Sequence, residues 1–359
     1  MKTFLLLRHL AGRGQARAGQ HFNSRTQLIF AIALVSALLL IPFAFTVGQF
    51  PISLAEIASL GWAKLSVGLS APVSSANIVL FEIRGPRIAA AFIVGAALAA
   101  AGAAFQNLFR NPLVSPDILG VSSGAALGAV TGIFLSLPLV AIQGLAFAGG
   151  LLAVAIIFWV GNKIRGHDPV LTLVLTGVVI GSLLGSGIAL TKYLADPFNQ
   201  LPAITYWLLG SFASVTARDI LLAFPIIFAA VVPLFLLRWR INLLALPDDE
   251  ARALGLGVRR MRLIVIVAAT LMTAASVAIC GIIGWVGLVI PHAVRMLVGA
   301  EFSRLLPLSM LIGGTFMLAV DTIGRSIAPT EIPPGVLTAL IGAPAFIWLM
   351  AATFKRRRS

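Results

Sequence analysis

Few polar residues of this chain are of types that could do chemistry, and they stand far apart. His292 has no histidine or carboxylate beside it at the spacing of a metal-ligand set, and the sequence holds no H-E-x-x-H motif and no Ser-His-Asp set. The pattern therefore favours a histidine that is hydrogen-bonded locally near a helix end. Cys280 is the only cysteine, which excludes an internal disulfide and a cysteine-based metal site. We expect no catalytic residue, no metal site and no cofactor.

Two kinds of energy coupling can be sought in the sequence. No G-x-x-x-x-G-K-S/T loop is present, so the chain does not hydrolyse ATP by that route. A carrier coupled to protons or sodium usually buries acidic groups near the middle of the membrane, but the one candidate, Asp321, stands near the end of an apolar segment. A stand-alone secondary transporter remains a rival class, and so does a membrane enzyme, which would need a polar cluster at helix ends. The missing groups disfavour both.

The polar segment 238–262 separates the two halves of the chain and predicts one short helix. An acidic start and a glycine stop predict that helix over 248–254. Pro247, Asp248 and Asp249, followed by Glu250, form the start, and Gly255 and Gly257, which come after Ala253 and Leu254, form the stop. A short helix between basic anchors could dock into a groove on a soluble partner. It could also be an ordinary interfacial loop, and the pattern alone leaves both interpretations open.

Three glycines form a stripe in the fifth apolar segment. Gly177, Gly181 and Gly185 recur every four residues, which places them on one face of a helix. Such a stripe lets another backbone approach closely, and helix packing is the interpretation that we favour. The same small residues could instead leave room for a solute along a pathway.

Charged residues gather where the second apolar segment begins and where the ninth ends. They are Glu82, Arg84, Arg87, Arg325 and Glu331. Arg84 and Arg87 share a helical face because they are three residues apart. Arginines in this position could extend to lipid headgroups. They could also pair with carboxylates of an external protein, for which the planar guanidinium is well suited.

The elements that position these residues are membrane spans. Of the 359 residues 59% are hydrophobic and only 11% are charged, with a mean hydropathy of +1.03, whereas a soluble domain carries roughly 25% charged residues. A bilayer core about 30 Å thick needs roughly 20 apolar residues per helix. We therefore predict an all-α polytopic membrane protein with about ten spans: 28–47, 86–109, 118–137, 141–160, 170–190, 220–237, two within 263–298 on either side of a glycine-rich break at 281–287, 305–323 and 335–353.

The remaining segments do not cross the membrane. Residues 52–69 predict an interfacial helix, and 196–214 predict a half-helix that prolines interrupt. The basic segment 1–27 is expected to be a partly disordered cytoplasmic tail. Residues 28–354 then form one transmembrane domain, and 355–359 form a second basic cytoplasmic tail.

The basic residues orient the chain. With both termini in the cytoplasm, 20 of the 26 lysines and arginines fall in cytoplasmic segments, as the positive-inside rule requires. The net charge of +14 therefore does not indicate nucleic acid, because no basic patch stands beside stacking aromatic residues. We expect a multi-pass protein of the cytoplasmic (inner) membrane, with lipid as its surroundings.

Three long blocks carry a family resemblance. They are IRGPRIAAAFIVGAALAAAGAAFQNLFRNPLVSPDILGVSSGAALGA (83–129), GIIGWVGLVIPHAVRMLVGAEFSRLLPLSMLIGG (281–314) and DTIGRSIAPTEIPPGVLTALIGAPAFIWLM (321–350). With the ALGL of residues 253–256, they resemble the FecCD-type permeases, the membrane subunits of ABC importers for ferric siderophores, haem and cobalamin. Gly85 and Trp285 depart from the family, which usually has Leu and commonly Phe there.

The resemblance implies a type II ABC importer permease fold and a set of partners. These are a second permease subunit, identical or paralogous, two cytoplasmic ATPase subunits and an external substrate-binding protein. The family's coupling helix, which docks on the ATPase, falls on residues 248–257. Arg84, Arg87 and Arg325 match the family's outer-face arginines, which receive glutamates of the binding protein.

On this resemblance the chain is a transport permease rather than an enzyme. We expect it to take up iron complexes, ferric siderophores first, with haem or cobalamin as the alternative cargo. Chelated iron is large, so the pathway should be wide and should offer few polar contacts. Recognition of the cargo would then lie mainly in the binding protein.

Overall fold

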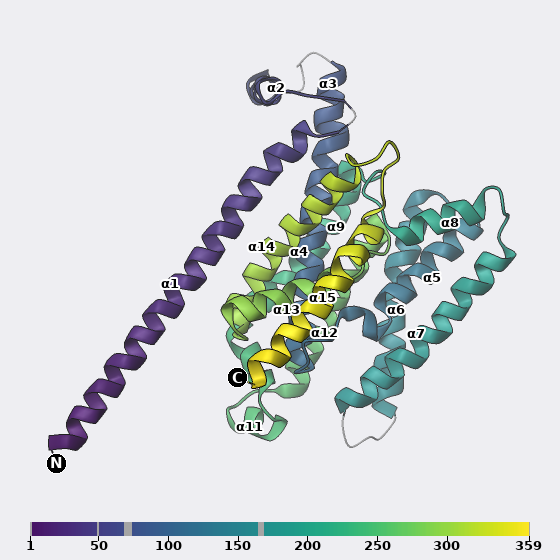
Figure 1. Ribbon diagram of the computed structural model, residues 1–359. Coiled ribbons are helices and arrows are strands. Elements are labelled where there is room, and N and C mark those ends of the chain that lie inside the picture. The colour runs from purple at the N-terminus through teal and green to yellow at the C-terminus, as the bar shows by residue number, and fades with distance from the viewer. Residues whose placement is uncertain (1, 49, 68–73, 164–168, 359) are drawn as a thin grey trace.

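The computed structural model describes residues 2–48, 50–67, 74–163 and 169–358, and every regular element in that part of the chain is a helix. Figure 1 shows the helices side by side in one bundle, with α1 along one flank and α7 along the other. Eight helical runs are long and apolar enough to cross a membrane. They are α1 (Lys2–Thr46), the run from α3 to α4 (Ser75–Leu108), α6 (Leu139–Lys163), α7 (Pro169–Leu194), α9 (Ala217–Leu236), α12 (Val258–Cys280), α14 (Phe302–Gly324) and α15 (Pro334–Arg358).

Two shorter apolar helices complete the set. They are α5 (Val121–Phe134) and α13 (Val286–Val298), and each lies where the sequence predicts a span. With the eight long runs they account for the ten predicted spans. The prediction of an all-α polytopic membrane protein is therefore confirmed.

The second helical run begins earlier than the sequence predicts, whereas the first agrees closely. Helix α1 starts at Lys2, but its part that is apolar enough to cross a membrane begins at Ser24, near the predicted residue 28. The second helical run starts at Ser75 rather than at residue 86 because the Ser74 hydroxyl accepts a hydrogen bond from the Asn77 N–H at 3.2 Å and caps the helix. From α3 (Ser75–Ile78) the π-helical η2 (Val79–Arg84) continues directly into α4 (Gly85–Leu108).

The third span is shorter than predicted. Residues 118–137 were expected to form one helix, but the 3-10 helix η3 (Pro116–Leu119) precedes α5. Gly120 separates the two because it adopts a left-handed conformation with φ of +63°, which glycine populates without steric cost.

The non-crossing helices lie where they were predicted. α2 (Leu54–Val67) corresponds to the interfacial helix, and α8 (Gln200–Leu209) to the half-helix. The polar segment between the two halves folds as α10 (Arg238–Ile241), η4 (Asn242–Ala245) and α11 (Asp248–Ala253).

The two ends of the bundle differ in what they carry. Figure 1 places α11 at the same end as the beginning of α1 and the end of α15, and places α2 and α3 at the opposite end. We call these the α11 end and the α2 end. An even number of crossings returns the chain to the end at which it began.

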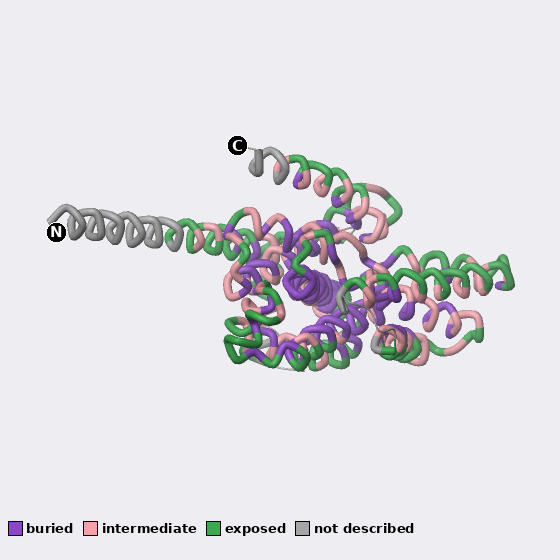
Figure 2. Tube along the Cα trace, turned by 90° about the horizontal axis from the view of Figure 1, so that it is seen from below, coloured by how far each residue is buried: buried purple, intermediate pink, exposed green. Residues whose placement is uncertain are grey.

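Helix α4 forms the centre of the core, and nearly all of its residues are buried. Glycines let its neighbours approach closely: a Cβ on Gly95 would lie 2.3 Å from the Gly313 oxygen of α14, and a Cβ on Gly102 would lie 1.8 Å from the Gly287 oxygen of α13. Figure 2 shows the buried residues concentrated at the middle of the bundle. Few residues in the membrane-length parts of α1, α7 and α15 are buried in the single chain.

Candidate functional site

The three predicted docking arginines meet at the α2 end. Arg84 is the last residue of η2, Arg87 lies in the first turn of α4, and Arg325 follows the last turn of α14. Their exposed fractions are only 4%, 8% and 5%. The sequence suggested lipid headgroups or an external protein as their partners, but in the folded chain all three bind other parts of the same chain.

Arg87 forms a buried ion pair with Asp321. Its Nε lies 3.0 Å from both carboxylate oxygens, and its Nη2 lies 2.8 Å from Oδ1. Its Nη1 also binds Glu331 at 2.9 Å. Because Asp321 is fully buried and belongs to α14, this pair joins α4 to α14 at the α2 end.

Arg84 and Arg325 hold the end of α1. Arg84 donates to the carbonyls of Phe45, at 2.6 Å, and of Phe50. Arg325 donates to the carbonyls of Val47, at 2.7 Å, and of Ala44. The last carbonyls of a helix have no partner within the helix and attract cations, so the two arginines cap α1 and attach it to the core.

Two further features fit this cap. Gly48 adopts φ of +146°, and a Cβ there would lie 2.6 Å from Nη2 of Arg84. Burial lowers the pKa of the Arg325 guanidinium to about 10, and the attraction of Asp321 opposes that shift. Arg325 therefore remains a cation at neutral pH.

The predicted short helix stands at the α11 end. Helix α11 is confirmed over Asp248–Ala253, and it ends where Gly255 adopts φ of +81°. Ala251 of this helix is buried, whereas Leu254, which follows the helix, is 62% exposed. An exposed leucine next to exposed arginines gives this loop an apolar contact point with a basic rim.

The carboxylates that begin α11 have different partners. Asp248 binds Arg110 at 3.0 Å and Arg262 at 2.6 Å, whereas Asp249 binds only its near neighbour Arg252, at 3.2 Å, among the described pairs. Sequence reasoning treated both aspartates as a start signal and missed the two distant arginines. No local pattern could have revealed the Arg110 contact, because 138 residues separate it from Asp248.

The glycine stripe of α7 divides into two parts. A Cβ on Gly177 would lie 2.2 Å from the Ile118 oxygen of η3, so Gly177 serves close packing. A Cβ on Gly181 or Gly185 would meet nothing within 4 Å. Within this chain Gly177 makes the close packing contact, and whether Gly181 and Gly185 serve packing or a pathway stays a prediction.

We expected His292 to lie at a helix end with a local hydrogen bond, and this expectation is wrong. It lies inside α13 with an exposed fraction of 3%, and neither ring nitrogen has a hydrogen-bond partner among the described residues. Its ring packs against Phe346 of α15 with 6.2 Å between centroids. In the same described part of the chain, no three His, Cys, Asp or Glu residues gather as a metal site would require.

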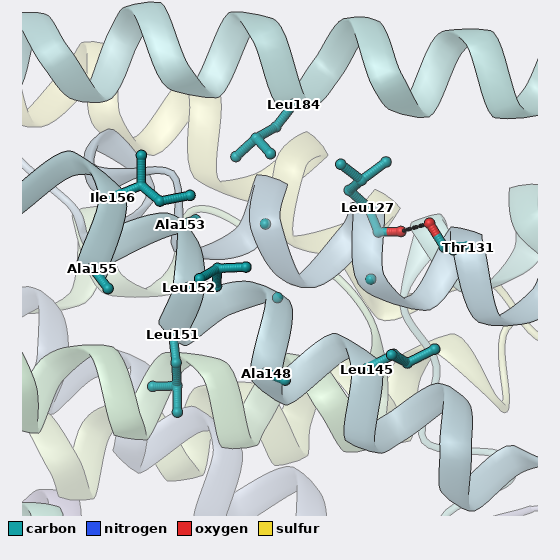
Figure 3. A pocket seen from close by; sticks show the side chains of 13 residues that line it. Leu127, Thr131, Leu145, Ala148, Leu151, Leu152, Ala153, Ala155, Ile156 and Leu184 are labelled. Carbon is teal, nitrogen blue, oxygen red and sulfur yellow. Dashed lines mark hydrogen bonds between the residues drawn. The ribbon is translucent and has the colours of Figure 1, made fainter. Parts of the chain in front are cut away.

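A cavity with apolar walls lies away from both charged ends. It is a groove of about 720 Å³ between α5, α6 and α7, and Figure 3 shows its walls of leucine, isoleucine and alanine. The hydroxyl of Thr131, at one side of the groove, donates to the Leu127 carbonyl at 2.7 Å. Its apolar walls offer a charged solute no ionic partner.

Comparison with known proteins gives consistent matches over most of the chain. Residues 33–352 match the model of the FecCD transport family. The chain is 39% identical over 325 residues to the molybdate import system permease protein MolB of Haemophilus influenzae, with 90% of this chain and 95% of that one covered. It is 40% identical over 298 residues to the cobalamin import system permease protein BtuC of Halobacterium salinarum, covering 81% and 79% of the two chains.

An iron relative and a solved structure extend this picture. The Fe(3+) dicitrate transport system permease protein FecD of Escherichia coli is 41% identical over 278 residues, covering 76% of this chain and 85% of its own. A solved structure described as an inward-facing conformation of a metal-chelate type ABC transporter superposes with a TM-score of 0.80 at 36% identity. That superposition covers 91% of this chain and 99% of the other.

Proposed function

The chain belongs to the FecCD transport family of ABC importer permeases, and we propose that it takes up iron complexes, with ferric siderophores as its cargo. The match of residues 33–352 to the family model carries this proposal. The relative FecD, which belongs to an Fe(3+) dicitrate system, supports iron. Haem and cobalamin remain alternative cargoes.

The exposed faces of two spans fit a bulky, chelated cargo. Helix α7 exposes mainly apolar side chains together with the open glycines Gly181 and Gly185, and α15 exposes further large apolar side chains such as Trp348. We propose that these faces line a pathway shared with a second permease subunit. A chelate hides the charge of its metal, so a wall with few polar groups can pass it without binding it tightly.

Two cytoplasmic ATPase subunits drive the pathway in this proposal. Each docks on α11, where Leu254 enters a groove on the ATPase and the surrounding arginines meet an acidic rim. ATP binding closes the ATPase pair, moves α11 and opens the pathway to the other side. The α11 end and both termini then face the cytoplasm, and the protein lies in the inner membrane.

An external binding protein delivers the cargo to the α2 end. We propose that its glutamates reach Arg84 and Arg325 by displacing the neutral carbonyls that these arginines bind in the free chain. A carboxylate is a stronger acceptor than a carbonyl, since hydrogen bonds to ionised groups are roughly twice as strong. Arg87 already binds Asp321 at 2.8 Å and Glu331 at 2.9 Å, so it holds this end of the bundle together and is not a free donor.

Docking can be measured directly. Replacing Arg84 and Arg325 together with glutamine should weaken binding-protein affinity while the ATPase still copurifies. Unchanged affinity for the binding protein would remove the docking assignment. Lys192 is a cation in the last turn of α7, at the same end of the bundle. Replacing Lys192 with glutamine is therefore the control for a general loss of charge.

A specific observation also favours molybdate as a second candidate cargo. The relative MolB belongs to a molybdate system and aligns over 90% of this chain. Molybdate is a small oxyanion, so it would need donor groups along its route. The apolar exposed faces of α7 and α15 are less suited to it than to a chelate.

Uptake decides between these cargoes. Cells that lack this chain, and the same cells complemented, are given radioactive iron as ferric siderophores, labelled molybdate, haem or labelled cobalamin. We expect siderophore iron uptake to be lost and then restored by complementation. Unchanged iron uptake would overturn the iron proposal, and restored molybdate, haem or cobalamin uptake would name the cargo instead.

A further inference from the structure

One carboxylate oxygen joins three elements at the α11 end. Oδ1 of Asp248 lies 3.0 Å from Nη2 of Arg110 and 2.6 Å from Nη2 of Arg262. Arg110 follows the last turn of α4, and Arg262 belongs to the second turn of α12. Asp248 itself begins α11, so it links this short helix to two of the most buried spans of the molecule.

The α4 side of this link is held firmly. Arg110 adopts φ of +52°, a conformation that costs energy for any residue with a Cβ and persists where its surroundings enforce it. Its Nε also donates to the Leu244 carbonyl at 2.9 Å. One turn earlier, Asn107 donates to the Ile241 carbonyl at 2.8 Å. The end of α4 therefore binds the loop before α11 through side-chain hydrogen bonds from Asn107 and Arg110.

The loop is also fixed to α14. The backbone N–H of Phe302, the first residue of α14, donates to the side-chain oxygen of Asn242 at 2.6 Å. At the opposite end of the bundle, Arg87 and Asp321 join α4 to α14. Helices α4, α12 and α14 are therefore all tied to the segment that carries α11.

We propose that Asp248 is a positioning residue that transmits the movement of α11 into α4 and α12. This inference rests on the proposed function, in which an ATPase docks on α11. A helix of six residues is too short to hold its own position, so its attachments decide whether a push on it moves the spans. Asp248 supplies the charged attachment, and the buried Ala251 supplies the apolar one.

The chain offers a matched control for this role. Asp249 is the next residue on the same helix and has the same side chain, but it is 96% exposed, whereas Asp248 is 28% exposed. Its partner Arg252 lies on α11 itself, so this pair connects α11 to nothing else. Replacing Asp249 with asparagine removes the same charge without cutting a link to the spans.

The experiment uses the whole transporter, with its ATPase and binding-protein subunits, in lipid vesicles. It measures three quantities: copurification of the ATPase, basal ATP hydrolysis and the stimulation of hydrolysis by the binding protein. For Asp248→Asn we expect the ATPase to copurify and basal hydrolysis to continue, while stimulation falls by at least about fivefold. Asp249→Asn changes the docking surface but no link to the spans, so it should retain several times the stimulation of Asp248→Asn. Asp248→Glu, which retains the charge, should recover most of the wild-type stimulation.

Three other outcomes overturn the proposal or the function on which it rests. Stimulation of Asp248→Asn at the level of Asp249→Asn would show that the link transmits nothing. Loss of ATPase copurification would place Asp248 in the docking surface itself. If Asp248→Asn does not accumulate, Arg110→Gln cuts the α4 side of the link and should give the same loss of stimulation. A wild-type complex that the binding protein never stimulates would overturn the proposed function instead.

Discussion

Replacing Gly177 with alanine tests why this glycine faces η3. A Cβ there would lie 2.2 Å from the Ile118 oxygen, whereas a carbon and a carbonyl oxygen ordinarily approach to about 3.3 Å. The backbones of α7 and η3 would therefore have to separate by about 1 Å. Gly181 and Gly185 lie on the same helix, and a Cβ on either would meet nothing within 4 Å, so they are matched controls.

The comparison isolates the steric cost. Alanine is favoured over glycine in a helix by about 1 kcal/mol, and all three substitutions share this gain. Gly177→Ala alone carries the cost of overpacking, which is about 1–3 kcal/mol. At about 2 °C per kcal/mol for a chain of this size, its Tm should lie about 2–6 °C below those of the two controls.

The assay is thermal unfolding of the purified protein in lipid nanodiscs, followed by circular dichroism at one protein concentration. Gly181→Ala and Gly185→Ala should unfold at or slightly above the wild-type temperature. A Gly177→Ala protein as stable as the two controls would refute the packing role. A loss of stability in all three would instead show that the whole stripe packs against another chain.

Four other substitutions test the two charged ends. Asp321→Asn should lower the free energy of unfolding by about 3–5 kcal/mol because it leaves the buried Arg87 without its main partner. Glu331→Gln removes a half-exposed partner of the same arginine and should cost at most about 1 kcal/mol. Equal unfolding temperatures of these two variants would contradict this reasoning. Gly48→Ala should loosen the end of α1, seen as faster hydrogen exchange there, since its Cβ would enter the Arg84 guanidinium. Leu254→Asp should leave ATP hydrolysis running while uptake of the cargo stops, and full retention of uptake would remove the coupling role of α11.

The helices were predictable because their signals are local. Runs of apolar residues marked every span, and the Asp248 start with the Gly255 stop marked α11 to within a residue or two. The start of the second span was missed because the Ser74 cap stands beyond the apolar run. Gly120 shortened the third span through a backbone conformation that the apolar pattern does not record.

The partners of the charged residues were not predictable, because they come from distant parts of the sequence. Arg87 and Asp321 are 234 residues apart, and Arg325 binds a carbonyl 278 residues away. A sequence shows that an arginine stands at a span end, but not which backbone carbonyls lie beside it after folding. The same limit hid the packing of Gly177 against η3, since Gly181 and Gly185 give an identical pattern.

The distribution of these contacts indicates which helices can move relative to one another. Lipid tails are as apolar as leucine, so apolar side chains alone give helices little reason to stay together in a bilayer. Helices α4 and α14 touch backbone to backbone at Gly95 and share the ion pair of Arg87 and Asp321, which would leave buried charges unpaired if the helices parted. Helix α7 has a close glycine contact at Gly177, whereas Gly181 and Gly185 on the same helix are open. A conformational change in this fold should therefore keep α4 and α14 together and displace α7 against them.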